Sequence, residues 1–219
     1  NFVKNDLIQF TGVNPEKITV TLESADELPK GNEPVDELIG KKFIMYIGRP
    51  TPHKNLRRLI DAFALLQKKY PDLTLALAGK KDSNYARHET YVNEHGIKNV
   101  VFTGFISDEQ LRWMYENTAV YCFPSLSEGF GLPGLEAMLH GAPVTSSTAT
   151  CLPETHGDAA HYFDPFSVED IAKSIDDILS DDKLRNELVK KGKKHVKTFS
   201  WQRMAEQTLA VYEKYGRKS

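Results

Sequence analysis

The chain has 219 residues, of which 40% are hydrophobic and 26% charged, and its net charge is −2. This length suits one large globular domain or one and a half small ones, and the composition is that of an ordinary soluble protein. The near-neutral charge gives no general attraction to nucleic acid, and no apolar run approaches the ~18 residues of a membrane-spanning helix. The two cysteines, Cys122 and Cys151, form no CxxC motif, and we expect a reduced, cytoplasmic location.

The chain begins at Asn1 rather than at a methionine, and a helical pattern from Phe2 to Ile8 follows directly. We therefore expect this chain to be a fragment of a longer protein, with a processed or disordered N-terminus as the alternative. Short apolar, β-branched runs follow, and these predict strands at 18–22, 43–47, 73–77, 100–102, 119–123, 143–145 and 161–163. Several runs are continuously apolar, which favours strands buried on both faces of a parallel sheet.

Helical periodicity and capping residues define helices between these strands. The predicted helices are 56–66, 108–116, 168–179, 182–197 and 201–215, and serine N-caps precede three of them at Ser107, Ser167 and Ser200. The alternation of strands and helices predicts an α/β fold with right-handed crossovers. The segment from Leu28 to Lys42 is rich in Pro, Gly and acidic residues and is predicted to be a surface connection. A basic run at 190–197 is interpreted as a solvated helix face, with membrane or nucleic-acid contact as the alternative.

The segment from Glu128 to Glu136 places an acid at each end of a glycine-rich loop, between an apolar strand and a helix-forming run. Such a loop exposes backbone N–H groups at a helix N-terminus, where anions bind, and the two glutamates suit the hydroxyls of a sugar or ribose. Its GxGxxG spacing matches the dinucleotide fingerprint, which also has an acidic residue about 20 positions further on to bind the ribose. Residues 145–148, at about that position, are Thr-Ser-Ser-Thr and include no acid, which argues against a nicotinamide dinucleotide site. A turn needed only to join strand to helix is the alternative.

A second loop, from Gly48 to Asn55, follows the strand predicted at 43–47 and contains Arg49 and Lys54. In open α/β sheets this carboxyl edge of the strands is where ligands bind. A guanidinium and an ammonium suit a diphosphate, and ordinary surface charge is the alternative.

Two further loops, 79–82 and 103–106, would reach the same edge of a parallel sheet. They could frame a nucleobase with backbone atoms and the side chain of Ile106, with plain connecting loops as the alternative. The sequence has no D-x-D pair for a metal–diphosphate bridge and no zinc spacing among its seven histidines. His140, His156 and His161 are interpreted as helix-end or packing residues.

These motifs resemble the C-terminal half of family-4 retaining glycosyltransferases, which have the GT-B fold of two Rossmann-like domains. The resemblance covers nearly the whole chain and centres on residues 127–138 (SEGFGLPGLEAM). It also includes Gly48-Arg49, Lys54-Asn55, Thr103-Gly104-Phe105 and Leu152-Pro153-Glu154. The Leu-Pro-Gly form of the loop is most similar to bacterial enzymes that add mannose or related sugars to glycans.

The resemblance implies a fold and a set of site residues. Residues 1–219 would form a single Rossmann-like donor-binding domain, one half of a GT-B fold, with a mostly parallel sheet flanked by helices. Arg49 and Lys54 would hold the diphosphate and stabilise it as it leaves, and Glu128 would face the hydroxyls of the donor sugar.

The resemblance also implies the contacts to the rest of the donor. Backbone N–H groups of Phe130, Gly131 and Leu132 would bind a phosphate. Glu136, in the first helical turn, would bind the ribose hydroxyls, and Ile106 would lie near the base. The family needs no metal and no cofactor beyond the nucleotide sugar.

The implied reaction is retaining transfer from a nucleotide diphosphate sugar, possibly GDP-mannose, to a glycan or lipid-linked acceptor. The acceptor would bind mostly on the N-terminal domain, which is absent here, and the full-length protein could contact the cytoplasmic face of a membrane peripherally. A non-catalytic nucleotide-binding or regulatory module, or a sugar-nucleotide epimerase-like domain, is the alternative.

Overall fold

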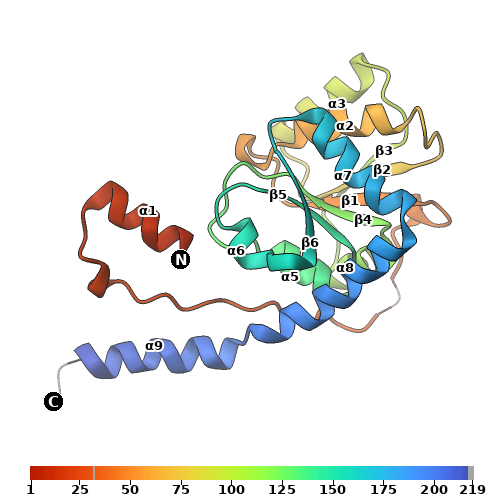
Figure 1. The fold of residues 1–219 in the computed structure, drawn as a ribbon. Coiled ribbons are helices and arrows are strands. Elements are labelled where there is room, and N and C mark those ends of the chain that lie inside the picture. Colours follow the sequence, from red (N-terminus) through yellow and green to blue (C-terminus); the bar gives the residue numbers. More distant parts are fainter. Residues whose placement is uncertain (32, 217–219) are drawn as a thin grey trace.

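Six parallel strands form one sheet at the centre of the computed structural model, which describes residues 1–31 and 33–216 (Figure 1). The strands are β1 (Phe43–Ile47), β2 (Thr74–Ala78), β3 (Val100–Gly104), β4 (Val120–Phe123), β5 (Val144–Ser147) and β6 (Ala160–Phe163). Their order across the sheet is β3-β2-β1-β4-β5-β6. The predicted α/β fold with a parallel sheet is therefore confirmed, and the predicted ends of these strands lie within two residues of the observed ones.

Helices cover both faces of the sheet, which explains why the central strands are continuously apolar. One face is covered by α2 (Leu56–Leu66), α3 (Ser83–Glu94) and α7 (Val168–Ser180). The other is covered by α4 (Asp108–Asn117) and α5 (Leu132–Leu139). The helix α8 (Asp182–His195) packs beside both α5 and α7. The capping box predicted at Ser107 is present, since its hydroxyl accepts from the Gln110 N–H while the Gln110 side chain accepts from the Ser107 N–H.

The strand predicted at residues 18–22 is wrong. This segment is extended, but it pairs with no strand within residues 1–31 and 33–216. A β-branched run has a strand's local preference, but only a neighbouring strand supplies the ladder of hydrogen bonds. Here the carbonyl of Ile18 accepts instead from the Lys4 ammonium, at 2.9 Å.

Two helices escape prediction, α3 and the short α6 (Leu152–His156). The helix α3 buries only Tyr85 and Val92, so its apolar stripe is weak, and its start is fixed by Asp82, whose carboxylate accepts from two backbone N–H groups. The connection predicted at 28–42 is irregular apart from one 3-10 turn, and Asn32 lies outside the described residues. It is not wholly a surface segment, because Val35 and Leu38 are buried in the core.

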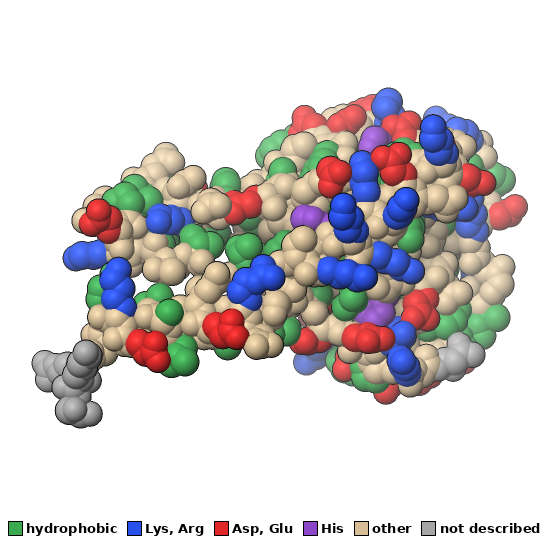
Figure 2. Space-filling model, turned by 60° about the horizontal axis from the view of Figure 1, so that its bottom comes forward, with side chains coloured by type: hydrophobic (Ala, Val, Ile, Leu, Met, Phe, Trp, Pro, Cys, Tyr) green, Lys and Arg blue, Asp and Glu red, His purple; other side chains and the backbone are tan. Residues whose placement is uncertain are grey.

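The two ends of the described chain project from the sheet as an arm (Figure 1). The arm consists of α1 (Phe2–Thr11), the extended segment that follows it, and α9 (Trp201–Tyr215), and neither helix contains a fully buried residue. Apolar side chains are therefore exposed along it (Figure 2), among them Phe10, Leu209, Tyr212 and Tyr215. Across the described ranges, none of the helices has both the length and the apolar character that a membrane span requires.

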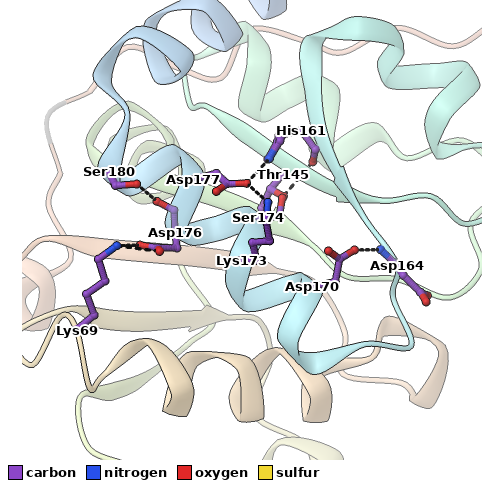
Figure 3. A network of polar contacts seen from close by, with 10 residues as sticks. All are labelled: Lys69, Thr145, His161, Asp164, Asp170, Lys173, Ser174, Asp176, Asp177 and Ser180. Atoms are coloured by element: carbon purple, nitrogen blue, oxygen red, sulfur yellow. Dashed lines mark hydrogen bonds and ion pairs between the residues drawn. The ribbon is translucent and has the colours of Figure 1, made fainter.

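A polar network ties α7 to its neighbours (Figure 3). The carboxylate of Asp176 accepts from the Lys69 ammonium at 2.7 and 2.8 Å and from the Tyr70 hydroxyl at 2.5 Å. One residue later, Asp177 pairs with His161 of β6 at 3.1 Å and with Lys173 at 2.8 Å. Burial acts to raise the pKa of Asp176, but the hydrogen bonds from Lys69 and Tyr70 hold this pKa below the ordinary carboxyl value.

Candidate functional site

The order of the strands reverses between β1 and β4, because β2 and β3 follow on one side of β1 whereas β4, β5 and β6 follow on the other. In open parallel sheets the loops at the carboxyl ends of two such strands diverge and leave a crevice for a ligand. The loop after β1 contains Arg49 and Lys54, and the loop after β4 contains Glu128. The fold therefore places both predicted loops at the crevice.

Lys54 and Glu128 meet across this crevice. The Lys54 Nζ lies 2.6 Å from Glu128 Oε1, and the two side chains are only 20% and 12% exposed. The loops themselves are joined by a hydrogen bond from the Leu126 N–H to the His53 carbonyl, at 2.7 Å. The pair holds the two side chains close together, and the ammonium and the carboxylate retain capacity for further hydrogen bonds.

Asn55 fixes the position of Lys54. Its backbone is left-handed, with φ of 60°, and it ends a 3-10 turn over Pro52–Lys54. Its buried side-chain amide donates to the carbonyls of Pro124, at 3.0 Å, and Pro165, at 2.8 Å. One side chain thus joins the loops that follow β1, β4 and β6.

The backbone of Glu128 is held by the residues just before α6. Its N–H donates to Thr150 Oγ1 at 3.0 Å, and its carbonyl accepts from the Thr150 hydroxyl at 3.3 Å and from the Cys151 thiol at 3.2 Å. Thr150 has a positive φ of 52°, which is uncommon for a β-branched residue. Such strain is typical of positions that the surrounding structure must hold in place.

The start of α5 leaves backbone donors free. The helix begins at Leu132, three residues before the predicted run, because Gly131 takes a left-handed N-cap conformation with φ of 100°. Within the part of the chain that the structure describes, the N–H groups of Phe130, Gly131 and Leu132 donate no hydrogen bond. Free donors at a helix N-terminus form a site for an anion such as phosphate.

Glu136 lies in the second turn of α5, because the helix begins earlier than predicted. It is half-buried, and its Oε2 accepts from the Tyr115 hydroxyl at 3.3 Å. Burial raises the pKa of Glu136, and the hydrogen bond from Tyr115 partly offsets this increase. The other carboxylate oxygen remains available to a hydroxyl donor.

Arg49 lies apart from the Lys54–Glu128 pair. Its side chain is 78% exposed, and its Nε lies 3.5 Å from the Asp82 carboxylate in the loop after β2. Backbone N–H groups, first that of Tyr85, lower the pKa of Asp82 and keep it charged. Arg49 therefore faces the neighbouring loop, where a bound anion could compete with Asp82 for it.

A cavity of about 540 Å³ lies at the carboxyl ends of β1, β2 and β3. Its lining includes Arg49, Asp82, Phe105, Ile106 and Leu111. The loops 79–82 and 103–106 thus share one cavity, as their places in a parallel sheet predict. Its volume is within the range of small-molecule sites, which is roughly 300–1,000 Å³. No cluster of three or more His, Cys, Asp or Glu side chains in residues 1–31 and 33–216 is arranged to hold a metal ion.

Comparison with known proteins identifies the family. Residues 31–195 match the family model described as Glycosyl transferases group 1. This chain belongs to that family. It is 32% identical to O-antigen chain mannosyltransferase B of Escherichia coli, over 97% of this chain and 58% of that protein. It is 33% identical to an MMP alpha-(1->4)-mannosyltransferase of Mycolicibacterium hassiacum, over 96% of this chain and 51% of that protein.

Solved structures of glycosyltransferases share the fold. Sucrose-phosphate synthase of Thermosynechococcus elongatus superposes with a TM-score of 0.72 and 29% identity, covering 80% of this chain and 45% of that one. The C-terminal domain of a group 1 glycosyl transferase family protein from Francisella tularensis gives a TM-score of 0.63 and 29% identity, covering 72% and 85%. The predicted recognition of a mannosyltransferase-like glycosyltransferase domain is confirmed. This chain spans little more than half the length of the curated relatives named above.

Sequence reasoning missed several residues that support the candidate site. Asn55 and Thr150 hold the loops through contacts with residues more than 20 positions away in the chain, and Ser146 contacts His156. His156, predicted to be a helix-end or packing residue, is both, since it is the last residue of α6 and is buried against the glycine loop. An asparagine directly before a helix is a local signal that could have identified Asn55, because asparagine tolerates a left-handed backbone, whereas nothing local distinguishes Ser146 and Thr150.

Proposed function

We propose that this chain binds the nucleotide diphosphate sugar donor of a retaining glycosyl transfer. The observation that carries the proposal is the Lys54–Glu128 pair, half-buried in the crevice between β1 and β4, beside the free N–H groups at the start of α5. This arrangement offers positive charge and backbone donors to a diphosphate, and it offers a carboxylate to the hydroxyls of the sugar next to it.

Each group has a distinct part in the proposed reaction. Lys54 and the N–H groups of the glycine loop bind the diphosphate, and Arg49 approaches it by leaving Asp82. Their positive charge stabilises the diphosphate as the bond to the anomeric carbon breaks, without requiring a metal ion. Glu128 orients the sugar through its hydroxyls, and Glu136 binds the ribose, with Ile106 beside the base.

The configuration at the anomeric carbon is retained if the acceptor attacks that carbon from the same face of the sugar that the diphosphate leaves. Retaining hydrolases instead use two carboxyl groups about 5 Å apart, one of them a nucleophile. Glu128 is instead paired with the ammonium of Lys54. We therefore assign Glu128 to binding and orientation rather than to nucleophilic attack.

The finer assignment of donor and acceptor rests on the relatives. Two of them are named as mannosyltransferases, so we propose GDP-mannose as the donor and a glycan or lipid-linked sugar as the acceptor. The acceptor would bind to a second domain, like the remaining half of the longer relatives. The exposed apolar side chains of the projecting arm support a contact between the arm and this second domain.

Calorimetry of this chain with GDP, UDP and ADP tests the proposal. We expect GDP to bind most tightly and Lys54→Ala to weaken its binding about 10- to 100-fold, because a charge-assisted hydrogen bond to phosphate is lost. Arg49→Ala should also weaken binding. Arg57→Ala is the matched control, because Arg57 is likewise exposed with an aspartate 3.5 Å from its Nε.

Thermal unfolding of each variant shows whether the fold is retained. If none of the three diphosphates binds the unaltered chain, or if the Arg49→Ala, Lys54→Ala double variant binds them equally well, the donor site is assigned incorrectly. Tighter binding of UDP or ADP than of GDP would contradict only the choice of base.

A further inference from the structure

His156 lies directly beneath the glycine loop. It is the last residue of α6, and its side chain is 0% exposed. Its Nε2 is 3.2 Å from the carbonyl oxygen of Gly131, and its Nδ1 is 3.2 Å from the hydroxyl of Ser146 in β5. The imidazole therefore connects the start of α5 to the sheet.

The partners of the imidazole determine where its proton lies. The carbonyl of Gly131 can only accept a hydrogen bond, so Nε2 carries the proton and donates it. Nδ1 is then the acceptor, and the Ser146 hydroxyl donates to it. Burial lowers the pKa of His156 to about 4, so the ring is neutral near pH 7 and both hydrogen bonds can form.

Glycines make room for this contact. A Cβ atom on Gly134 would lie 2.6 Å from His156 Cε1, which is closer than two carbon atoms can pack. A Cβ on Gly131 would lie 3.3 Å from His156 Nε2. The carbonyl of Gly131 also accepts from the Gly134 N–H at 3.1 Å. The last glycine of the GxGxxG spacing thus serves the approach of a histidine.

We infer that His156 is a positioning residue for the diphosphate of the donor, acting through the Gly131 carbonyl to hold the free N–H groups of the glycine loop in place. This inference rests on the proposed function. The loop has few side chains of its own to fix it, and ordering it only when the ligand binds would cost conformational entropy. The histidine supplies that order beforehand, and it never touches the ligand itself.

Two substitutions separate this role from simple packing. His156→Gln retains an N–H donor that can reach the Gly131 carbonyl, whereas His156→Met fills similar space without any donor. We expect His156→Met to weaken the binding of GDP about 3- to 30-fold, the effect of losing one or two buried hydrogen bonds. We expect His156→Gln to bind GDP within about twofold of the unaltered chain, since one hydrogen bond is retained.

Ser146→Ala is a milder variant that remains informative if His156→Met fails to fold. It removes the hydroxyl that selects the tautomer, and we expect about two- to fivefold weaker binding of GDP. Nitrogen-15 NMR provides a readout without ligand, in which His156→Met should shift the amide signals of Phe130, Gly131 and Leu132 and His156→Gln should largely restore them.

The outcomes distinguish this inference from the proposed function. If the unaltered chain binds no nucleoside diphosphate, the proposed function fails and the role of His156 in phosphate binding fails with it. If the unaltered chain binds GDP and a folded His156→Met or Ser146→Ala variant binds it equally well, only the positioning role is overturned. Equal loss in His156→Met and His156→Gln would also overturn it, because the donor would then be irrelevant.

Discussion

Single side chains connect the loops of this site. Asn55 donates from one amide group to the loops after β4 and β6, and Thr150 holds the backbone of Glu128 on both its N–H and its carbonyl. Each contact joins residues more than 20 positions apart in the chain. The geometry of the Lys54–Glu128 pair therefore depends on polar residues that do not themselves face a ligand.

Replacing Asn55 by Asp tests this dependence. The new carboxylate has the shape of the amide but no N–H, so it would set a buried charge against the carbonyl oxygens of Pro124 and Pro165. We expect the free energy of unfolding to fall by about 3 kcal/mol, measured by urea denaturation.

Asn99→Asp is the matched control for this substitution. Asn99 also has a positive φ, 55°, and donates to one carbonyl, that of Pro71 at 2.9 Å, but it is exposed. Its substitution should cost less than about 1 kcal/mol, since water can solvate the new charge. Equal losses at the two sites would contradict the importance of the buried amide.

At the scale of elements, α7 is held to the sheet by apolar burial and by an acidic pair on its outer side. Its buried side chains include Ile171, Ile175 and Ile178, which are packed in the core with α2 and β4. Asp176 and Asp177 add contacts to residues after α2 and in β6 (Figure 3). The helix thus spans the two halves of the sheet on either side of the crevice.

Asp176→Asn should weaken this attachment. The amide keeps the shape of the carboxylate but loses its charge toward the Lys69 ammonium and one acceptor oxygen. We expect a loss of about 1 kcal/mol in unfolding free energy, measured with urea. Asp182→Asn is the control, because Asp182 pairs with Arg185 at 3.1 Å but is 79% exposed, and it should cost less than about 0.5 kcal/mol. A larger effect at Asp182 would contradict the assignment of the network.

At the scale of the whole molecule, buried histidines make the fold sensitive to acid. Burial lowers the pKa of His88, His140 and His156 in the folded chain, with the value for His156 about 4 against an ordinary 6.5. Between these values the unfolded chain binds more protons than the folded one. The contribution of His156 is therefore fully present above pH 6.5 and is lost as the pH falls toward 4.

We expect the unfolding free energy to decrease between pH 6.5 and 4, with His156 accounting for about 3 kcal/mol of the loss. Urea denaturation across this range measures the decrease. His156→Gln should flatten the profile, because glutamine does not titrate. His53→Gln is the control, since His53 is exposed and lies in the loop after β1. An unchanged profile in His156→Gln would show that the histidine is not buried as a neutral group.

The sequence alone determined the α/β class, all six strands of the sheet and the two loops of the crevice. Apolar runs, caps and glycines are local signals, because they reflect the burial and the backbone conformation of each segment itself. The strand predicted at 18–22 failed for the opposite reason, since a strand requires a partner that local sequence does not supply.

The tertiary structure alone decided how the site is assembled. It showed that Lys54 pairs with Glu128 while Arg49 turns to Asp82, and that Asn55, Thr150 and His156 hold the loops. These contacts join distant segments, and their energy depends on burial and on the direction of each hydrogen bond. The burial of a contact and the direction of a hydrogen bond cannot be predicted from composition, periodicity or motif spacing, because both arise only when the strands are brought side by side.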